Sequence, residues 1–145
     1  LTDLINLAAS AAMAACDVDC GDRELSMLMT DDVTMAELNR EWRGGHGATN
    51  VLSFPGDLDG PGTLLIGDVA LALETIVAEA SDADISVADH LIHLVVHGVL
   101  HLLGYDHKTK TQAEEMETLE IGILQSLGIS DPYIFNRAEP FETAK

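Results

Sequence analysis

The chain has 145 residues, of which 47% are hydrophobic, so it is long enough and apolar enough to form one domain with a buried core. Its formal net charge is −18, from 25 acidic and 7 basic residues, and such an acidic surface argues against broad, charge-driven binding to nucleic acid. No apolar run reaches the ~18 residues that a membrane span needs, and the first basic residue comes only at Arg23, which is not typical of a secretory signal.

The order of hydrophobic segments predicts an α+β fold, in which a small mixed β-sheet packs with about four to five α-helices in one domain over residues 1–145. The expected elements, in chain order, are a helix over about 2–16, a strand over 24–30, a helix from 34, strands over 50–55 and 64–73, a helix from 74, a helix over 86–103 and a last helix from 111 to 128. Pro132 and Pro140 lie in the tail over 129–145, which is predicted to be irregular.

Three of these helices are predicted to begin at a capping pair, in which a hydroxyl residue is followed three positions later by an acidic one. The three pairs are Thr34 with Glu37, Ser86 with Asp89, and Thr111 with Glu114. The apolar stripe expected to be buried on the last helix is Met116, Leu119, Ile123 and Leu127. Cys16 and Cys20 are the only cysteines, and we expect reduced thiols in a cytoplasmic protein.

The stretch "HGVLHLLGYDH", from His97 to His107, carries the clearest chemical signal. His97 and His101 are four residues apart on a predicted helix, so they share one face on adjacent turns. Gly104 can take the left-handed conformation that ends a helix, and the chain can then return His107 over that face. The spacing predicts one Zn²⁺ ion bound by these three imidazoles, with a fourth position open to water. His90 and His93 are expected to serve in packing or in supporting contacts, or to lie on the helix surface.

The residue after His97 distinguishes this stretch from the zinc peptidases, which have a glutamate there as general base. Here that residue is Gly98, and we expect it to leave space for substrate beside the ion. Three neutral imidazoles leave the ion its full double positive charge, which suits a phosphodiester at least as well as a peptide. The sequence does not identify a general base.

The few cations lie close to the informative segments. Arg40 and Arg43 share one segment, and Lys108 and Lys110 follow directly after His107. This distribution predicts a small local anion site on an otherwise acidic protein.

Three segments, in this order, resemble the YbeY family of bacterial rRNA-maturation endoribonucleases: "LNREWRGGHGATNVLSFP" (38–55), "LIGDVAL" (65–71) and "HGVLHLLGYDH" (97–107). The resemblance implies a zincin-like metal hydrolase arrangement, and His97, His101 and His107 match the three zinc ligands. Arg43 matches an arginine associated with activity, and Asp68 matches a recurrent acid whose role is open between orienting a ligand, capping a strand end and contacting a partner. The family's usual first strand has no counterpart before the first helix expected here, which leaves the strand order open.

The resemblance further implies a zinc-dependent endoribonuclease of single-stranded RNA, acting in 16S rRNA 3′-end maturation and ribosome quality control. Its expected partners are an rRNA precursor and the ribosomal small subunit or its proteins, and no membrane. One alternative is a small metal-dependent peptidase or other hydrolase, against which Gly98 counts. Another is a non-catalytic ribosome assembly factor with structural zinc. Only three ligands are evident in the sequence, which counts against it because structural zinc usually has four protein ligands.

Overall fold

The computed structural model describes residues 2–16, 24–45, 47, 49–55, 65–105 and 108–129. Within these ranges it has five helices and three strands, which confirms the expected α+β fold. The elements are α1 (Thr2–Ala15), β1 (Glu24–Thr30), α2 (Asp32–Arg43), β2 (Val51–Pro55), β3 (Leu65–Ala72), α3 (Leu73–Ala83), α4 (Val87–Leu102) and α5 (Lys110–Ser126). In the described part, no single helix is long and apolar enough to cross a membrane, although α3 and α4, bent by 119° at their junction, meet that criterion together by length and composition.

The sheet is mixed and has the strand order β1-β3-β2. The central strand β3 runs parallel to β1 and antiparallel to β2. Its residues from Val69 to Ala72 are all buried, because helices cover this strand on both faces. This explains why the segment reads as a continuous apolar run and not as an alternation of apolar and polar residues.

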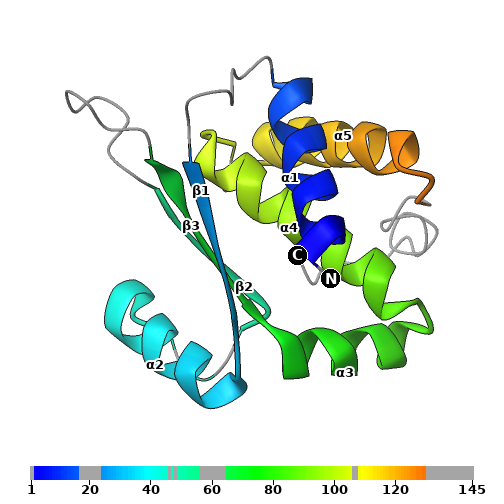
Figure 1. Ribbon diagram of the computed structural model, residues 1–145. Helices are drawn as coiled ribbons and strands as arrows, with labels where there is room; N and C mark the ends of the chain where they lie inside the picture. Colours follow the sequence, from blue (N-terminus) through cyan, green and yellow to red (C-terminus); the bar gives the residue numbers. More distant parts are fainter. Residues whose placement is uncertain are drawn as a thin grey trace.

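The helices cover the two faces of the sheet unequally (Figure 1). On one face, Val69 and Leu71 join the main core, which includes residues of α1, α4 and α5. On the other face, Ala70 and Ala72 pack with Leu52 and with Met35 of α2 in a smaller cluster. Since successive side chains of a strand point to opposite faces, α2 and α4 lie on opposite sides of the sheet.

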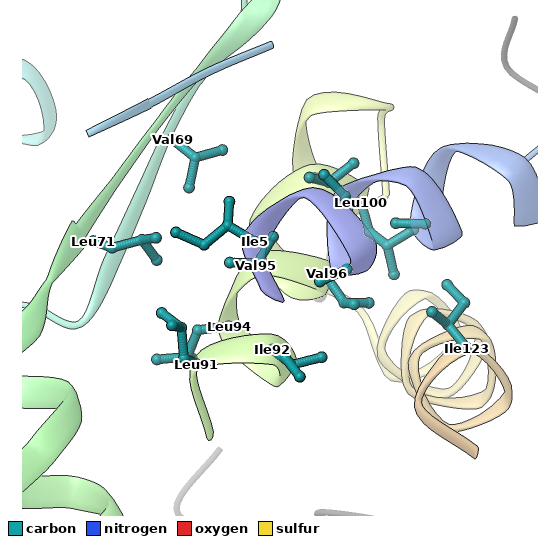
Figure 2. Close-up of a cluster of buried hydrophobic side chains, with 14 of the residues drawn as sticks. Ile5, Val69, Leu71, Leu91, Ile92, Leu94, Val95, Val96, Leu100 and Ile123 are labelled. Carbon is teal, nitrogen blue, oxygen red and sulfur yellow. The ribbon is translucent and has the colours of Figure 1, made fainter. Parts of the chain in front are cut away.

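The helix α4 forms the centre of the main core, between the sheet, α1 and α5 (Figure 2). It is buried around most of its circumference, as expected for a helix that is apolar on nearly all sides. Its buried residues are Leu91, Ile92, Leu94, Val95, Val96, Gly98, Val99, Leu100 and Leu102. Each large apolar side chain buried in this way contributes about 1.5–3 kcal/mol of transfer free energy. The histidines of α4 are therefore carried by the most firmly packed element of the fold.

Two of the three predicted capping pairs are wrong, and the third is right in its first residue. Helix α2 begins after Asp31, whose side chain accepts a hydrogen bond of 2.8 Å from the Thr34 amide, so Thr34 lies inside the helix. Helix α4 begins after Ser86, as predicted, and the Ser86 hydroxyl accepts from the Asp89 amide. Several side chains near the start of each helix could act as the N-cap. The one that does so is the residue whose own backbone is extended just before the first helical turn.

The N-cap of helix α5 lies two residues earlier than predicted. Thr109 is its N-cap and forms a complete capping box with Gln112, in place of the predicted pair of Thr111 and Glu114. The predicted buried stripe faces the core as expected: Met116 and Ile123 are buried, and Leu119 and Leu127 are partly buried against the core. The buried positions further include Leu124 and the charged residue Glu120. The tail over 130–145 lies outside the described residues.

Candidate functional site

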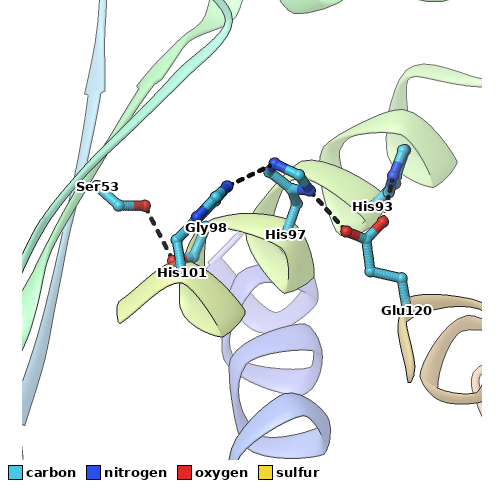
Figure 3. A network of polar contacts seen from close by, with 6 residues as sticks. All are labelled: Ser53, His93, His97, Gly98, His101 and Glu120. Atoms are coloured by element: carbon cyan, nitrogen blue, oxygen red, sulfur yellow. Dashed lines mark hydrogen bonds and ion pairs between the residues drawn. The ribbon is translucent and has the colours of Figure 1, made fainter. Parts of the chain in front are cut away.

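Two of the three predicted metal ligands face each other on the surface of α4. The Nε2 atoms of His97 and His101 are 3.0 Å apart, and the two ring centroids are 4.6 Å apart (Figure 3). This proximity follows from the spacing of four residues, which places side chains on adjacent turns of one helical face. Both residues are partly exposed, and His97 lines a cavity.

The second nitrogen of His97 contacts a buried carboxylate from α5. His97 Nδ1 lies 2.6 Å from Oε1 of Glu120, and His93 Nε2 lies 3.0 Å from Oε2 of the same residue. The side chain of Glu120 is only 1% exposed. Burial alone would raise the pKa of this carboxyl, but the hydrogen bonds and charges of His93 and His97 outweigh it and lower the pKa to about 2. Glu120 is therefore ionised at neutral pH.

The ionised carboxylate determines where the protons of both neighbouring rings lie. A carboxylate only accepts hydrogen bonds, so His97 Nδ1 and His93 Nε2 must each carry a hydrogen and donate it to Glu120. A neutral His97 ring then has its lone pair on Nε2, directed at His101. Two zinc-bound nitrogen atoms with bonds of ~2.0–2.1 Å in tetrahedral geometry would be about 3.3 Å apart. The observed separation of 3.0 Å fits such a pair within a few tenths of an ångström.

The third predicted ligand, His107, lies outside the described residues. Among the residues that are described, no three His, Cys, Asp or Glu side chains gather closely enough to hold a metal ion. The predicted turn before His107 is present in its first part. Gly104 has φ +104°, and its amide donates to the carbonyl of His101. This positive φ lets the chain leave the helix at the position that the sequence indicated.

Gly98 has a different role from the one expected. A Cβ atom at this position would lie 3.0 Å from Val69 Cγ1, 3.2 Å from Ser53 Oγ and 3.2 Å from Val51 Cγ2. Gly98 thus faces the sheet and not the space beyond His97 and His101, and the expectation that it leaves room for substrate is wrong. The Ser53 hydroxyl also donates a hydrogen bond of 2.9 Å to the Gly98 carbonyl (Figure 3). A side chain at position 98 would crowd the sheet, because α4 packs closely against it there.

Of the other two residues singled out from the sequence, Asp68 is described and does not lie with the histidine pair. Arg43 is the last residue of α2, and its side chain lies outside the description. Asp68 is exposed on β3 and lines a cavity of about 740 Å³ beside Trp42 and Phe54. Because Val69 faces α4, Asp68 points to the opposite face of the sheet. This placement speaks against a role of Asp68 in orienting His97.

A second cavity, of about 490 Å³, borders the histidine pair. Its lining includes His97 and Glu120, together with Asn50 and the lysines Lys108 and Lys110 at the start of α5. Both lysines are exposed. Two of the chain's seven basic residues thus lie beside the candidate metal ligands, on a molecule whose net charge is −18. The lining also includes the carboxylate of Glu117.

Glu120 was not among the site residues predicted from the sequence, although the sequence carries a signal for it. Glu120 lies four residues after Met116 and three before Ile123, so a charged residue occupies the apolar face of a predicted helix. A charge at such a position needs a partner, and α4 offers four histidines at helical spacing. The structure pairs Glu120 with two of them. A third, His90, contacts Glu79 at 2.9 Å.

Comparison with known proteins gives consistent relatives over most of the chain. The family model described as Endoribonuclease YbeY matches residues 1–128. The endoribonuclease YbeY of Paramagnetospirillum magneticum is 53% identical over 131 residues, covering 86% of this chain and 80% of the relative. The endoribonuclease YbeY of a Bradyrhizobium species is 46% identical over 139 residues, covering 90% of this chain and 81% of the relative.

The same comparison extends to solved structures. The solution structure of a Thermotoga maritima protein superposes with a TM-score of 0.59 and covers 99% of this chain and 91% of that chain. Its sequence identity is 22%, so this match shows the shared fold alone. The sequence relatives carry the assignment further: the chain belongs to the YbeY endoribonuclease family.

Proposed function

We propose that this chain is a zinc-dependent endoribonuclease that hydrolyses phosphodiester bonds of single-stranded RNA. We further propose that it acts in the cytoplasm on an rRNA precursor, in 16S rRNA 3′-end maturation and ribosome quality control. The family membership supports the endoribonuclease activity. The observation that supports the metal is the pair of Nε2 atoms of His97 and His101, which lie 3.0 Å apart while the other ring nitrogen of His97 contacts Glu120.

In this proposal, His97, His101 and His107 bind one Zn²⁺ ion. When bound, zinc supplies a Lewis acid for a phosphoryl oxygen and lowers the pKa of a coordinated water toward ~7. The guanidinium of Arg43 would bind the scissile phosphate in a bidentate way and offset the charge that develops in the transition state. Lys108 and Lys110 lie beside His97 at the neighbouring cavity, where they favour binding of the RNA backbone.

The test compares histidines of the same helix. His97→Ala and His101→Ala are each expected to lose bound zinc and the cleavage of a labelled single-stranded RNA, because each removes a ligand. His90→Ala is the matched control and is expected to keep both, because His90 contacts Glu79 and not the histidine pair. Metal analysis and a cleavage assay with and without chelator give the two readouts. Full RNA cleavage by a metal-free His97 variant would overturn the proposal.

The two alternatives make different predictions for the same samples. A peptidase would cleave casein or a peptide in a chelator-sensitive manner and leave RNA intact. An assembly factor with structural zinc would bind zinc without cleaving RNA and would show a fourth protein ligand in a metal-bound structure.

A further inference from the structure

We propose that Glu120, anchored by His93, is a positioning residue that fixes the tautomer and the orientation of His97 before the metal binds. This inference rests on the proposed function, in which His97 is a metal ligand. It assigns a role to two residues outside the predicted ligand set.

The side chain of Glu120 is held in place by two histidines. Glu120 comes from α5 and bridges two histidines of α4 that lie one turn apart, through Oε1 to His97 Nδ1 and through Oε2 to His93 Nε2. A carboxylate held by both oxygen atoms has little freedom to rotate. Its side chain is 1% exposed, so water competes weakly for the two hydrogen bonds. The distance of 2.6 Å to His97 is short, as expected for a charge-assisted hydrogen bond.

The second step concerns the His97 ring itself. A neutral imidazole carries one hydrogen, on either Nδ1 or Nε2, and the hydrogen bond made by one nitrogen decides the state of the other. With its hydrogen held on Nδ1 by Glu120, His97 presents a lone pair at Nε2 toward His101. In the opposite tautomer, a hydrogen would occupy the position of the metal. Glu120 thus prepares His97 to bind, which is the general role of carboxylates behind metal-bound histidines.

His93 supports the carboxylate and is not itself placed to bind the same ion. Its Nε2 is directed to Glu120, and its ring centroid is 6.4 Å from that of His97, compared with 4.6 Å between His97 and His101. His93 therefore holds the second oxygen of Glu120 and keeps the first one aligned with His97. Removing this donor is expected to loosen the carboxylate without removing a metal ligand.

The most direct test reads the tautomer in the metal-free protein. Nitrogen-15 NMR of the histidine side chains at about pH 8, where an ordinary imidazole is neutral, is expected to show His97 of the wild type with its hydrogen on Nδ1. In Glu120→Gln this preference should be lost, because an amide is no longer an obligatory acceptor. Glu117→Gln is the matched control: it removes the same charge from the same helix and cavity, and it should leave the His97 tautomer unchanged.

Zinc affinity provides the second readout, measured by competition with a chromophoric chelator. Glu120→Gln is expected to weaken zinc binding by about 10–100-fold, and Glu117→Gln to change it by less than about twofold. His93→Ala should also weaken binding, whereas His93→Gln, which can still donate to Oε2, should recover part of the loss. A Glu120→Gln protein with the wild-type tautomer and affinity would overturn the proposal, as would identical affinities of His93→Ala, His93→Gln and the wild type.

These outcomes remain informative if one variant fails to fold or if the proposed function fails. Circular dichroism monitors the fold, and if Glu120→Gln is unfolded, the comparison of His93→Ala with His93→Gln decides the question. If the wild type binds no zinc, the proposed function is wrong, while the tautomer of His97 in the metal-free protein still tests the role of Glu120.

Discussion

Gly98 shows how a single missing side chain serves the packing of the fold. The carbonyl of Gly98 accepts a hydrogen bond from the buried Ser53, and the backbone of α4 lies against Val51 and Val69 of the sheet. The residue directly after His97 therefore packs against the sheet. This explains physically why the glutamate of the zinc peptidases has no room here.

The first prediction compares Gly98 and Gly122, the two glycines inside the described helices. Gly98→Ala is expected to lower the free energy of unfolding by about 1–3 kcal/mol, because its Cβ would lie 3.0 Å from Val69 in a close-packed core. Gly122→Ala, in α5, is expected to raise it by about 0.5–1 kcal/mol, because no atom lies within 4 Å of its Cβ and alanine favours the helix. Urea unfolding of both variants measures the difference. Equal effects would show that Gly98 is not a contact point.

Helix α5 links the fold to the candidate site at the level of elements. It carries Glu120 into contact with α4, and Lys108 just before its N-cap and Lys110 at its first position line the same cavity as His97. Its starting point therefore affects both the buried carboxylate and the cations at the cavity. That start is set by the capping box of Thr109 and Gln112, which holds two backbone amides at 3.1 and 3.2 Å.

The second prediction distinguishes the observed cap from the one that the sequence suggested. Thr109→Ala is expected to lower the free energy of unfolding by about 1 kcal/mol, because it leaves the Gln112 amide without its acceptor. Thr111→Ala, inside the helix and exposed, should change it by less than about 0.5 kcal/mol. Thermal or urea unfolding gives both values. A larger loss for Thr111→Ala would mean that the helix begins where the sequence pattern placed it.

At the scale of the whole molecule, the charge distribution is unusual for a protein proposed to bind RNA. The net charge of −18 repels a polyanion, and the lysines beside His97 offset it only locally. Affinity for RNA is therefore expected to be weak and strongly dependent on salt. A protein at the ribosomal small subunit that delivers the RNA would resolve this difficulty.

The third prediction tests this local attraction by salt dependence, with RNA binding measured in chelator so that no cleavage occurs. Lys108→Ala is expected to weaken binding and to reduce the slope of log K against log salt by up to ~0.7, the value for one phosphate contact on a single strand. Arg40→Ala, which removes one charge from the exposed surface of α2, should leave the slope unchanged. Tight binding of the isolated wild type that does not vary with salt would contradict the expectation.

The elements themselves were largely predictable, because each depends on local pattern. The strands near 24–30 and 50–55, the passage from strand to helix near 73, and the helix that places His97 and His101 on one face all follow from hydrophobic periodicity. The helix starts at Asp31 and Thr109 did not follow, because several nearby side chains can serve as caps and the preceding backbone selects among them.

The sequence by itself determined the α+β class, the family, and the facing pair of histidines, since a spacing of four residues is sufficient to bring two side chains together on a helix. Only the tertiary structure decided what lies behind and beneath that pair. Glu120 reaches His97 and His93 because α5 packs against α4, and Gly98 meets the sheet because the two layers approach closely there. Such contacts join residues 20 or more positions apart in the chain, and no local pattern specifies the distance between two packed elements.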